Sequence, residues 1–175
     1  MEKNDVFDIF CTVVQMKEKE MRLYEKAVSS CKDSVGVQTF GMLRDSEREQ
    51  IARIAEIQTT LKSGGASLDA CRLYVPKSVD HKAFMKRIAA GRKKLDKACV
   101  DDLTAIELAL SLENEAIGYL NGEKERTEAP GVMDFLENLA SEERAHHAVL
   151  ADLRFYYLDP EGWFLEKERA VLDGA

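Results

Sequence analysis

Apolar residues recur at intervals of three and four positions along four stretches of the chain. This spacing places side chains on one face of an α-helix and predicts four long amphipathic helices. They cover about residues 5–31, 37–62, 101–122 and 131–158. After the fourth helix, Pro160 follows Asp159 and predicts the first turn of a short final helix. The pattern is that of an all-α protein.

The second and third helices are separated by a long irregular stretch, residues 63–100, which contains Pro76 and a short predicted helix at 80–90. This stretch is too long for a simple loop in a compact domain. We therefore expect a crossover that runs from one end of a helical bundle to the other. The length suits one domain over residues 1–175, with residues 159–175 as a C-terminal extension.

Polar side chains interrupt the apolar stripes at positions that face the predicted core. They are Lys17, Glu47, Gln50, Glu113, Glu143 and His146. Two pairs, Glu47 with Gln50 and Glu143 with His146, are three residues apart and so share a helix face. Burying such groups costs several kcal/mol unless a charge partner or a metal compensates. The pattern therefore indicates a polar site inside the bundle.

The interrupting residues also reveal an internal repeat. Adding 96 to a residue number in the first helix pair gives its counterpart in the second pair. The matched pairs are Lys17 with Glu113, Leu43 with Leu139, Glu47 with Glu143, and Gln50 with His146. A common register across a helix, a turn and a second helix predicts two equivalent hairpins related by a pseudo-twofold axis, with the polar residues meeting near it.

Over about residues 5–158 this arrangement resembles the rubrerythrin branch of the ferritin-like superfamily. The motifs that carry the resemblance are Leu23-Tyr-Glu-Lys26, Leu43-x-x-x-Glu47-x-x-Gln50, Glu113-Asn-Glu-Ala-Ile-Gly-Tyr119 and Leu139-Ala-Ser-Glu-Glu-x-x-His146. The resemblance implies a ferritin-like antiparallel four-helix bundle with a long crossover between its second and third helices. It also implies a centre for two iron or manganese ions, to which each hairpin gives one Glu and one Glu-x-x-His pair.

The chain departs from this family at one half of the centre. Lys17 stands where the resemblance implies a glutamate, Gln50 where it implies a histidine, and Ala116 where rubrerythrins have a further glutamate. No Cys-x-x-Cys motif of a rubredoxin-like electron-transfer domain is found. Mapped residue by residue, Glu47, Glu113, Glu143 and His146 remain as metal ligands. Three carboxylates, one ammonium and one divalent ion sum to zero charge, so we expect one iron or manganese ion with the lysine as a built-in cation.

Two other occupancies are compatible with this pattern. Two ions would need substitute ligands such as Asp45 or Glu49, although the stripe aims both off the core. Alternatively, no ion binds, and hydrogen bonds join the six polar residues into a network. Tyr24 lies inward near the site, where it either hydrogen-bonds a ligand or packs as a core residue. His81 and His147 are expected at the surface.

The implied function is that of a metal-binding protein with slow peroxide- or oxygen-linked oxidoreductase activity, for which an external electron donor would be needed. A metal-binding or metal-sensing protein without rapid catalysis is a second reading. The alternative is a metal-free structural or interaction module of the same fold. We expect a homodimer, and we expect Trp163 and Phe164 to pack either on the bundle or on a second subunit.

Charge and composition limit the partners and the location. The formal net charge of −7 argues against nucleic acid or an anionic membrane as a partner. No apolar run approaches the roughly 18 residues of a membrane span, and no signal-peptide pattern opens the chain. We therefore expect a cytoplasmic protein. The four cysteines, which are far apart in sequence, are expected to be reduced structural residues.

Overall fold

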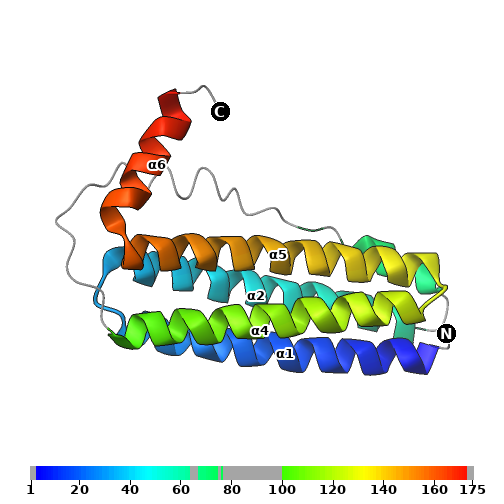
Figure 1. Ribbon diagram of the computed structural model, residues 1–175. Helices are drawn as coiled ribbons and strands as arrows, with labels where there is room; N and C mark the ends of the chain where they lie inside the picture. Colours follow the sequence, from blue (N-terminus) through cyan, green and yellow to red (C-terminus); the bar gives the residue numbers. More distant parts are fainter. Residues whose placement is uncertain (1–2, 64–66, 75, 77–99, 173–175) are drawn as a thin grey trace.

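A computed structural model describes residues 3–63, 67–74, 76 and 100–172 (Figure 1). These residues form helices and contain no strand, which confirms the all-α class. The helices are α1 (Lys3–Ser30), α2 (Ser34–Lys62), the 3₁₀ helix η1 (Leu68–Leu73), α4 (Val100–Arg126), α5 (Pro130–Leu158) and α6 (Pro160–Leu172). The short helix predicted at 80–90, with His81, lies outside the described residues.

The four long helices lie side by side (Figure 1). α1 packs against α2 and α4 against α5, and the two hairpins meet through α1 with α4 and α2 with α5. Neighbouring helices run in opposite directions (Figure 1). α2 ends and α4 begins at opposite ends of the bundle (Figure 1). Most of the predicted crossover between them, residues 77–99, lies outside the described residues.

The first hairpin closes more tightly than the apolar pattern predicts. α2 begins at Ser34 because the Asp33 side chain caps it, accepting hydrogen bonds from the Val35 and Gly36 backbone N–H groups, each at 3.0 Å. Gly36 has no space for a side chain. A Cβ there would lie 2.3 Å from the Tyr157 hydroxyl and 2.4 Å from Cys31 Sγ. This glycine therefore lets the α1–α2 turn pack directly on α5.

α4 extends to Arg126, four residues beyond the predicted end at Gly122. A Cβ at Gly122 would meet nothing within 4 Å, so no close contact requires a glycine here, and the helix continues through it at a propensity cost of about 1 kcal/mol. Lys124 and Arg126 lie in the last turn, where positive charge complements the helix dipole. Pro130 then opens α5 at a position that needs no backbone N–H.

The core consists of two apolar clusters at different heights along the bundle. One includes Phe10 of α1, Ile57 of α2, Leu120 of α4 and Phe135 of α5. The other includes Tyr24, Phe40, Ile106 and Leu150 of the same four helices. On every helix, the residues of the candidate site lie in the sequence between the members of the two clusters; they are Lys17, Glu47, Gln50, Glu113, Glu143 and His146. The candidate site is thus a polar layer with apolar packing on both sides.

The first turn of α6 packs against the end of α5. Trp163 of α6 is fully buried, its ring lies edge-on to Tyr156, and its Nε1 donates to Asp152 Oδ1 at 3.2 Å. Trp163 was expected to pack either on the bundle or on a second subunit, and the structure shows it packed on the bundle of its own chain. Phe164 is half-buried beside it, and the rest of α6 turns away from the four helices (Figure 1).

Two further expectations concern cysteines and membranes. Cys11, Cys31 and Cys71 have free thiols, and the last two are buried. Burial raises the pKa of the Cys71 thiol to about 11, which keeps it protonated and unreactive. Cys99 lies outside the described residues. None of the helices described combines the length and apolar character required to cross a bilayer.

Candidate metal centre

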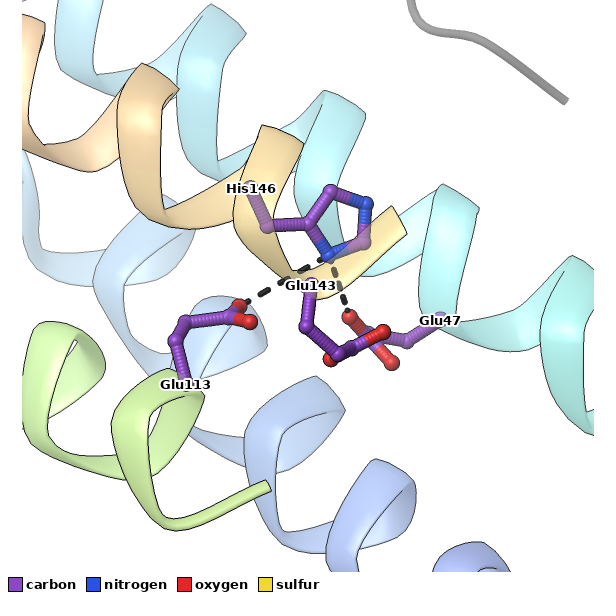
Figure 2. Close-up of side chains that lie close together, drawn as sticks. All are labelled: Glu47, Glu113, Glu143 and His146. Carbon is purple, nitrogen blue, oxygen red and sulfur yellow. Dashed lines mark ion pairs between the residues drawn. The ribbon is translucent and has the colours of Figure 1, made fainter. Parts of the chain in front are cut away.

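Four buried side chains from three helices converge in the polar layer (Figure 2). They are Glu47 of α2, Glu113 of α4, and Glu143 and His146 of α5, with at most 1% of any residue exposed. One donor atom from each lies within 4.8 Å of all the others. Opposite ligands of an ion with bonds of about 2.2 Å are roughly 4.4 Å apart. Small side-chain shifts would therefore close these four residues around one ion.

His146 presents one ring nitrogen to the carboxylates. Its Nδ1 lies 2.9 Å from Glu47 Oε1 and 3.6 Å from Glu113 Oε1 (Figure 2). Nε2 lies on the other side of the ring, 2.9 Å from the Ser46 hydroxyl. An Nε2–H donated to Ser46 would leave the Nδ1 lone pair free for a metal, as histidine ligands require. Ser46 is absent from the predicted site because a lone serine in a helix has no distinctive pattern.

Charge keeps His146 protonated when no metal binds. Burial alone would lower its pKa, but the facing carboxylates Glu113 and Glu47 outweigh burial and raise this pKa well above the usual value. Burial also raises the pKa of Glu143, despite the opposing effect of Lys17. A metal would therefore have to displace protons from its own ligands.

Lys17 is buried beside the four residues. Its ammonium pairs with Glu143 Oε2, with Glu20 Oε2 at 3.0 Å and with Glu47 Oε2 at 3.1 Å. Burial lowers the pKa of Lys17, but the surrounding carboxylates have a larger, opposite effect. The pKa is therefore well above the usual lysine value. Glu47 thus directs one oxygen to His146 and the other to Lys17. The carboxylate links the candidate metal position to the ammonium.

Glu20 is a fourth carboxylate of the polar layer and is absent from the predicted site. It lies one turn after Lys17 on α1 and is 1% exposed. The spacing of three residues was the available signal, because it places Glu20 on the inward face with Lys17. Burial raises the pKa of Glu20 to about 8, although Lys17 acts in the opposite direction. A protonated Glu20 preserves the balance of three carboxylates, one ammonium and one divalent ion.

Tyr24 supports the ligand on α4. Its hydroxyl donates to Glu113 Oε1 at 2.5 Å, and both side chains are fully buried. Burial raises the tyrosine pKa, so the hydroxyl stays protonated as a donor. Burial would also raise the Glu113 pKa, but His146, Lys17 and this hydrogen bond together lower it. The structure thus places Tyr24 as a hydrogen-bond partner of a candidate ligand.

The suggested substitute ligands for a second ion point elsewhere. Asp45 and Glu49 are exposed, and Asp45 pairs with Arg44 and Arg48 on the surface of α2. His147 is half-buried and is not one of the clustered residues. These positions give no support to a second ion held by unorthodox ligands.

A separate charged cluster lies next to the centre, around Glu142. Its carboxylate accepts a hydrogen bond from Tyr74 and pairs with Arg53 Nη2 at 2.9 Å. The Arg53 guanidinium also lies 4.5 Å from the centre of the Tyr74 ring. These contacts fasten the segment after η1 to α2 and α5, so Glu142 is neutralised there.

Buried polar atoms without a hydrogen-bond partner gather in the polar layer. Among the described side chains of this layer, the atoms with neither a hydrogen bond nor an ion pair are both polar atoms of Gln50, Glu113 Oε2 and Glu143 Oε1. Each unsatisfied buried group costs about 1–3 kcal/mol. Gln50 is fully buried, yet it does not join a hydrogen-bonded network of the six polar residues. The oxygen and imidazole donors fit a divalent iron or manganese ion.

Comparisons of the chain with protein-family models, with curated proteins and with solved structures found no match.

Proposed function

We propose that this protein binds one divalent metal ion, iron or manganese, through Glu47, Glu113, Glu143 and His146. The observation that carries the proposal is the convergence of four buried donors, among which Glu113 Oε2 and Glu143 Oε1 have no hydrogen-bond or ion-pair partner. A bound ion would neutralise the carboxylates and occupy the unused lone pairs. Three carboxylate oxygens and one imidazole nitrogen favour these metals over a thiolate-seeking ion.

The stoichiometry of one ion rests on Lys17. Its ammonium pairs with both Glu47 and Glu143, the two carboxylates that would bridge a pair of ions. A second ion beside a buried ammonium would meet strong repulsion. The lysine therefore serves as the second positive charge of the centre.

We further propose that the fold is ferritin-like and that the centre derives from a rubrerythrin-type di-metal site. The 96-residue repeat, the antiparallel neighbours and the opposite placement of the α2 end and the α4 start support this origin. Lys17 and Gln50 would then be replacements confined to one half of an originally symmetric centre.

A slow oxidoreductase reaction with peroxide or oxygen is the activity that this origin suggests. The bound ion would exchange one electron at a time with an external donor. The protein's own residues exclude water from the layer, orient His146 through Ser46 and orient Glu113 through Tyr24. The competing proposal is a metal-free structural or interaction module.

Metal analysis of protein produced with added iron or manganese tests the stoichiometry. We expect one equivalent per chain, and a loss of at least tenfold in affinity for His146→Ala. His147→Ala is the matched control, since its side chain is the next in sequence and lies outside the cluster. Zero or two equivalents would contradict the proposal.

Two measurements then separate activity from structure. A peroxidase assay with iron-loaded protein and a supplied reductant detects the oxidoreductase reaction. Addition of metal should raise the melting temperature if the centre binds it. An unchanged melting temperature and no turnover would favour the metal-free module.

A further inference from the structure

The Lys17 ammonium lies in a cage of three carboxylates from three helices. Glu20 comes from α1, Glu47 from α2 and Glu143 from α5. Lysine Nζ donates hydrogen bonds to Glu20 and to Glu143, and Glu47 Oε2 lies 3.1 Å from it. The side chains are at most 2% exposed. The ammonium is therefore separated from water and held by protein oxygens.

The cage matches an ammonium ion in donor count. A lysine ammonium has three N–H donors, and each of the three carboxylates turns one oxygen to it. Its distances to Glu20 and Glu47, 3.0 and 3.1 Å, are those of N–H···O contacts.

Glu20 distinguishes this cage from the proposed metal centre. It is not one of the four residues whose donors cluster, yet it is as deeply buried as they are. Its carboxylate is directed at Lys17, whereas Glu47 and Glu143 are shared with the candidate metal position. Glu143 directs Oε2 to Lys17, and its Oε1 has no hydrogen-bond partner. The cage is therefore a second cation position with its own dedicated residue.

We propose that Glu20, Glu47 and Glu143 form a binding site for a primary ammonium group, with Lys17 as its tethered occupant. If the tether is removed, a free alkylammonium ion takes the same position. The inference does not depend on a metal at His146, because the contacts to Lys17 are formed by the chain alone. In this proposal, Glu20 is the carboxylate that binds the ammonium group and takes no part in the candidate metal centre.

The test removes the tether and supplies the missing atoms in solution. Lys17→Ala deletes a three-carbon chain and its ammonium, which n-propylammonium reproduces. With EDTA present to exclude metals, we expect Lys17→Ala to melt below the wild type. n-Propylammonium should raise its melting temperature saturably, by roughly 5–10 °C at about 100 times Kd. Neutral n-propanol should not produce a saturable rise.

Two variants sharpen the assignment. Lys19→Ala is the matched control, since this lysine is on the same helix with 61% of its side chain exposed. n-Propylammonium should change neither the melting temperature of Lys19→Ala nor that of the wild type. At pH 9, above the Glu20 pKa of about 8, adding Glu20→Gln to Lys17→Ala should weaken n-propylammonium binding by about tenfold or more, because a charged acceptor is lost. Equal shifts in all three variants, or a rise with n-propanol, would overturn the proposal.

Two further measurements on Lys17→Ala, of its folding and of its metal uptake, also test the proposal. If Lys17→Ala is unfolded, n-propylammonium should restore its helical circular dichroism, and no restoration would overturn the proposal. Manganese titration with EDTA omitted distinguishes this site from the metal centre. If Lys17→Ala gains one ion relative to the wild type and n-propylammonium cannot displace it, the ammonium assignment is wrong. The proposed metal site at His146 would survive that result.

Discussion

The Tyr24 hydroxyl donates a hydrogen bond to the Glu113 carboxylate across the interface between α1 and α4, and both side chains are fully buried. The first hairpin thereby orients a candidate ligand that belongs to the second. Partners of metal ligands typically contribute 10- to 100-fold to metal affinity.

We therefore expect Tyr24→Phe to weaken manganese binding by about 10- to 100-fold while the bundle stays folded. Isothermal titration calorimetry measures the affinity. Tyr119→Phe is the control, because this tyrosine is half-buried on α4 and outside the polar layer. Equal affinities for Tyr24→Phe and the wild type would show that the hydrogen bond does not support a metal ligand.

Restoring the missing half of the centre should change its stoichiometry. In Lys17→Glu combined with Gln50→His, the ammonium is removed and two ligand types return at their pseudo-symmetric positions. We expect two metal equivalents per chain by elemental analysis, against one for the wild type. Gln50→His alone keeps the ammonium and should still bind one. A double variant that gains no metal would mean that the helices around Lys17 are no longer spaced for an ion.

Glu20 predicts a pH dependence of stability. Its pKa is about 8 in the folded protein and near 4.5 when unfolded. Between these values the folded state holds the additional proton, so this group's contribution to stability falls as pH rises from about 4.5 to 8 and is level above. The stability of Glu20→Gln relative to the wild type should therefore increase across this window. Urea unfolding of both metal-free proteins at several pH values measures this difference in unfolding free energy.

The control for this pH dependence is Glu18→Gln on the same helix, whose side chain is 45% exposed. Its stability difference from the wild type should not follow the same window. If the Glu20→Gln difference is also constant with pH, the carboxyl is not protonated in the folded protein.

Gly36 should not accept a methyl group. A Cβ there would collide with the Tyr157 hydroxyl and Cys31 Sγ, and overpacking of this kind costs about 1–3 kcal/mol. We expect Gly36→Ala to lower the unfolding free energy by this amount in urea titrations. Gly122→Ala, where the Cβ would enter open space, should instead raise it by about 0.5–1 kcal/mol. Similar effects of the two substitutions would contradict the close packing of the turn on α5.

The long helices could be predicted because each carries many apolar residues at helical spacing. Their ends were less predictable, since a side-chain cap at Asp33 and a tolerated Gly122 decide them locally. The 3₁₀ helix η1 has only six residues, too few for a periodic signal. Its position depends instead on packing against α5, where Gly131 leaves room for the Leu68 carbonyl.

The candidate ligands could also be predicted, because charged residues on an apolar stripe stand out. Glu20 and Ser46 could not be predicted, for different reasons. Glu20 lies among exposed charged residues of α1, so its burial becomes evident only when the other helices are packed around Lys17. Ser46 matters through one contact, with His146 Nε2. Contacts between helices determine both roles, and no spacing within a helix encodes them.

The polar layer has a further consequence for how the four helices align. Leucine, isoleucine and phenylalanine in the two apolar clusters would pack tolerably if a helix slid by one turn. Lys17 and its carboxylates would not, since a shifted helix would leave buried charges without partners. The polar layer thus specifies one axial register of the four helices. Replacing its charged residues with apolar ones would permit several registers, even where it increased stability.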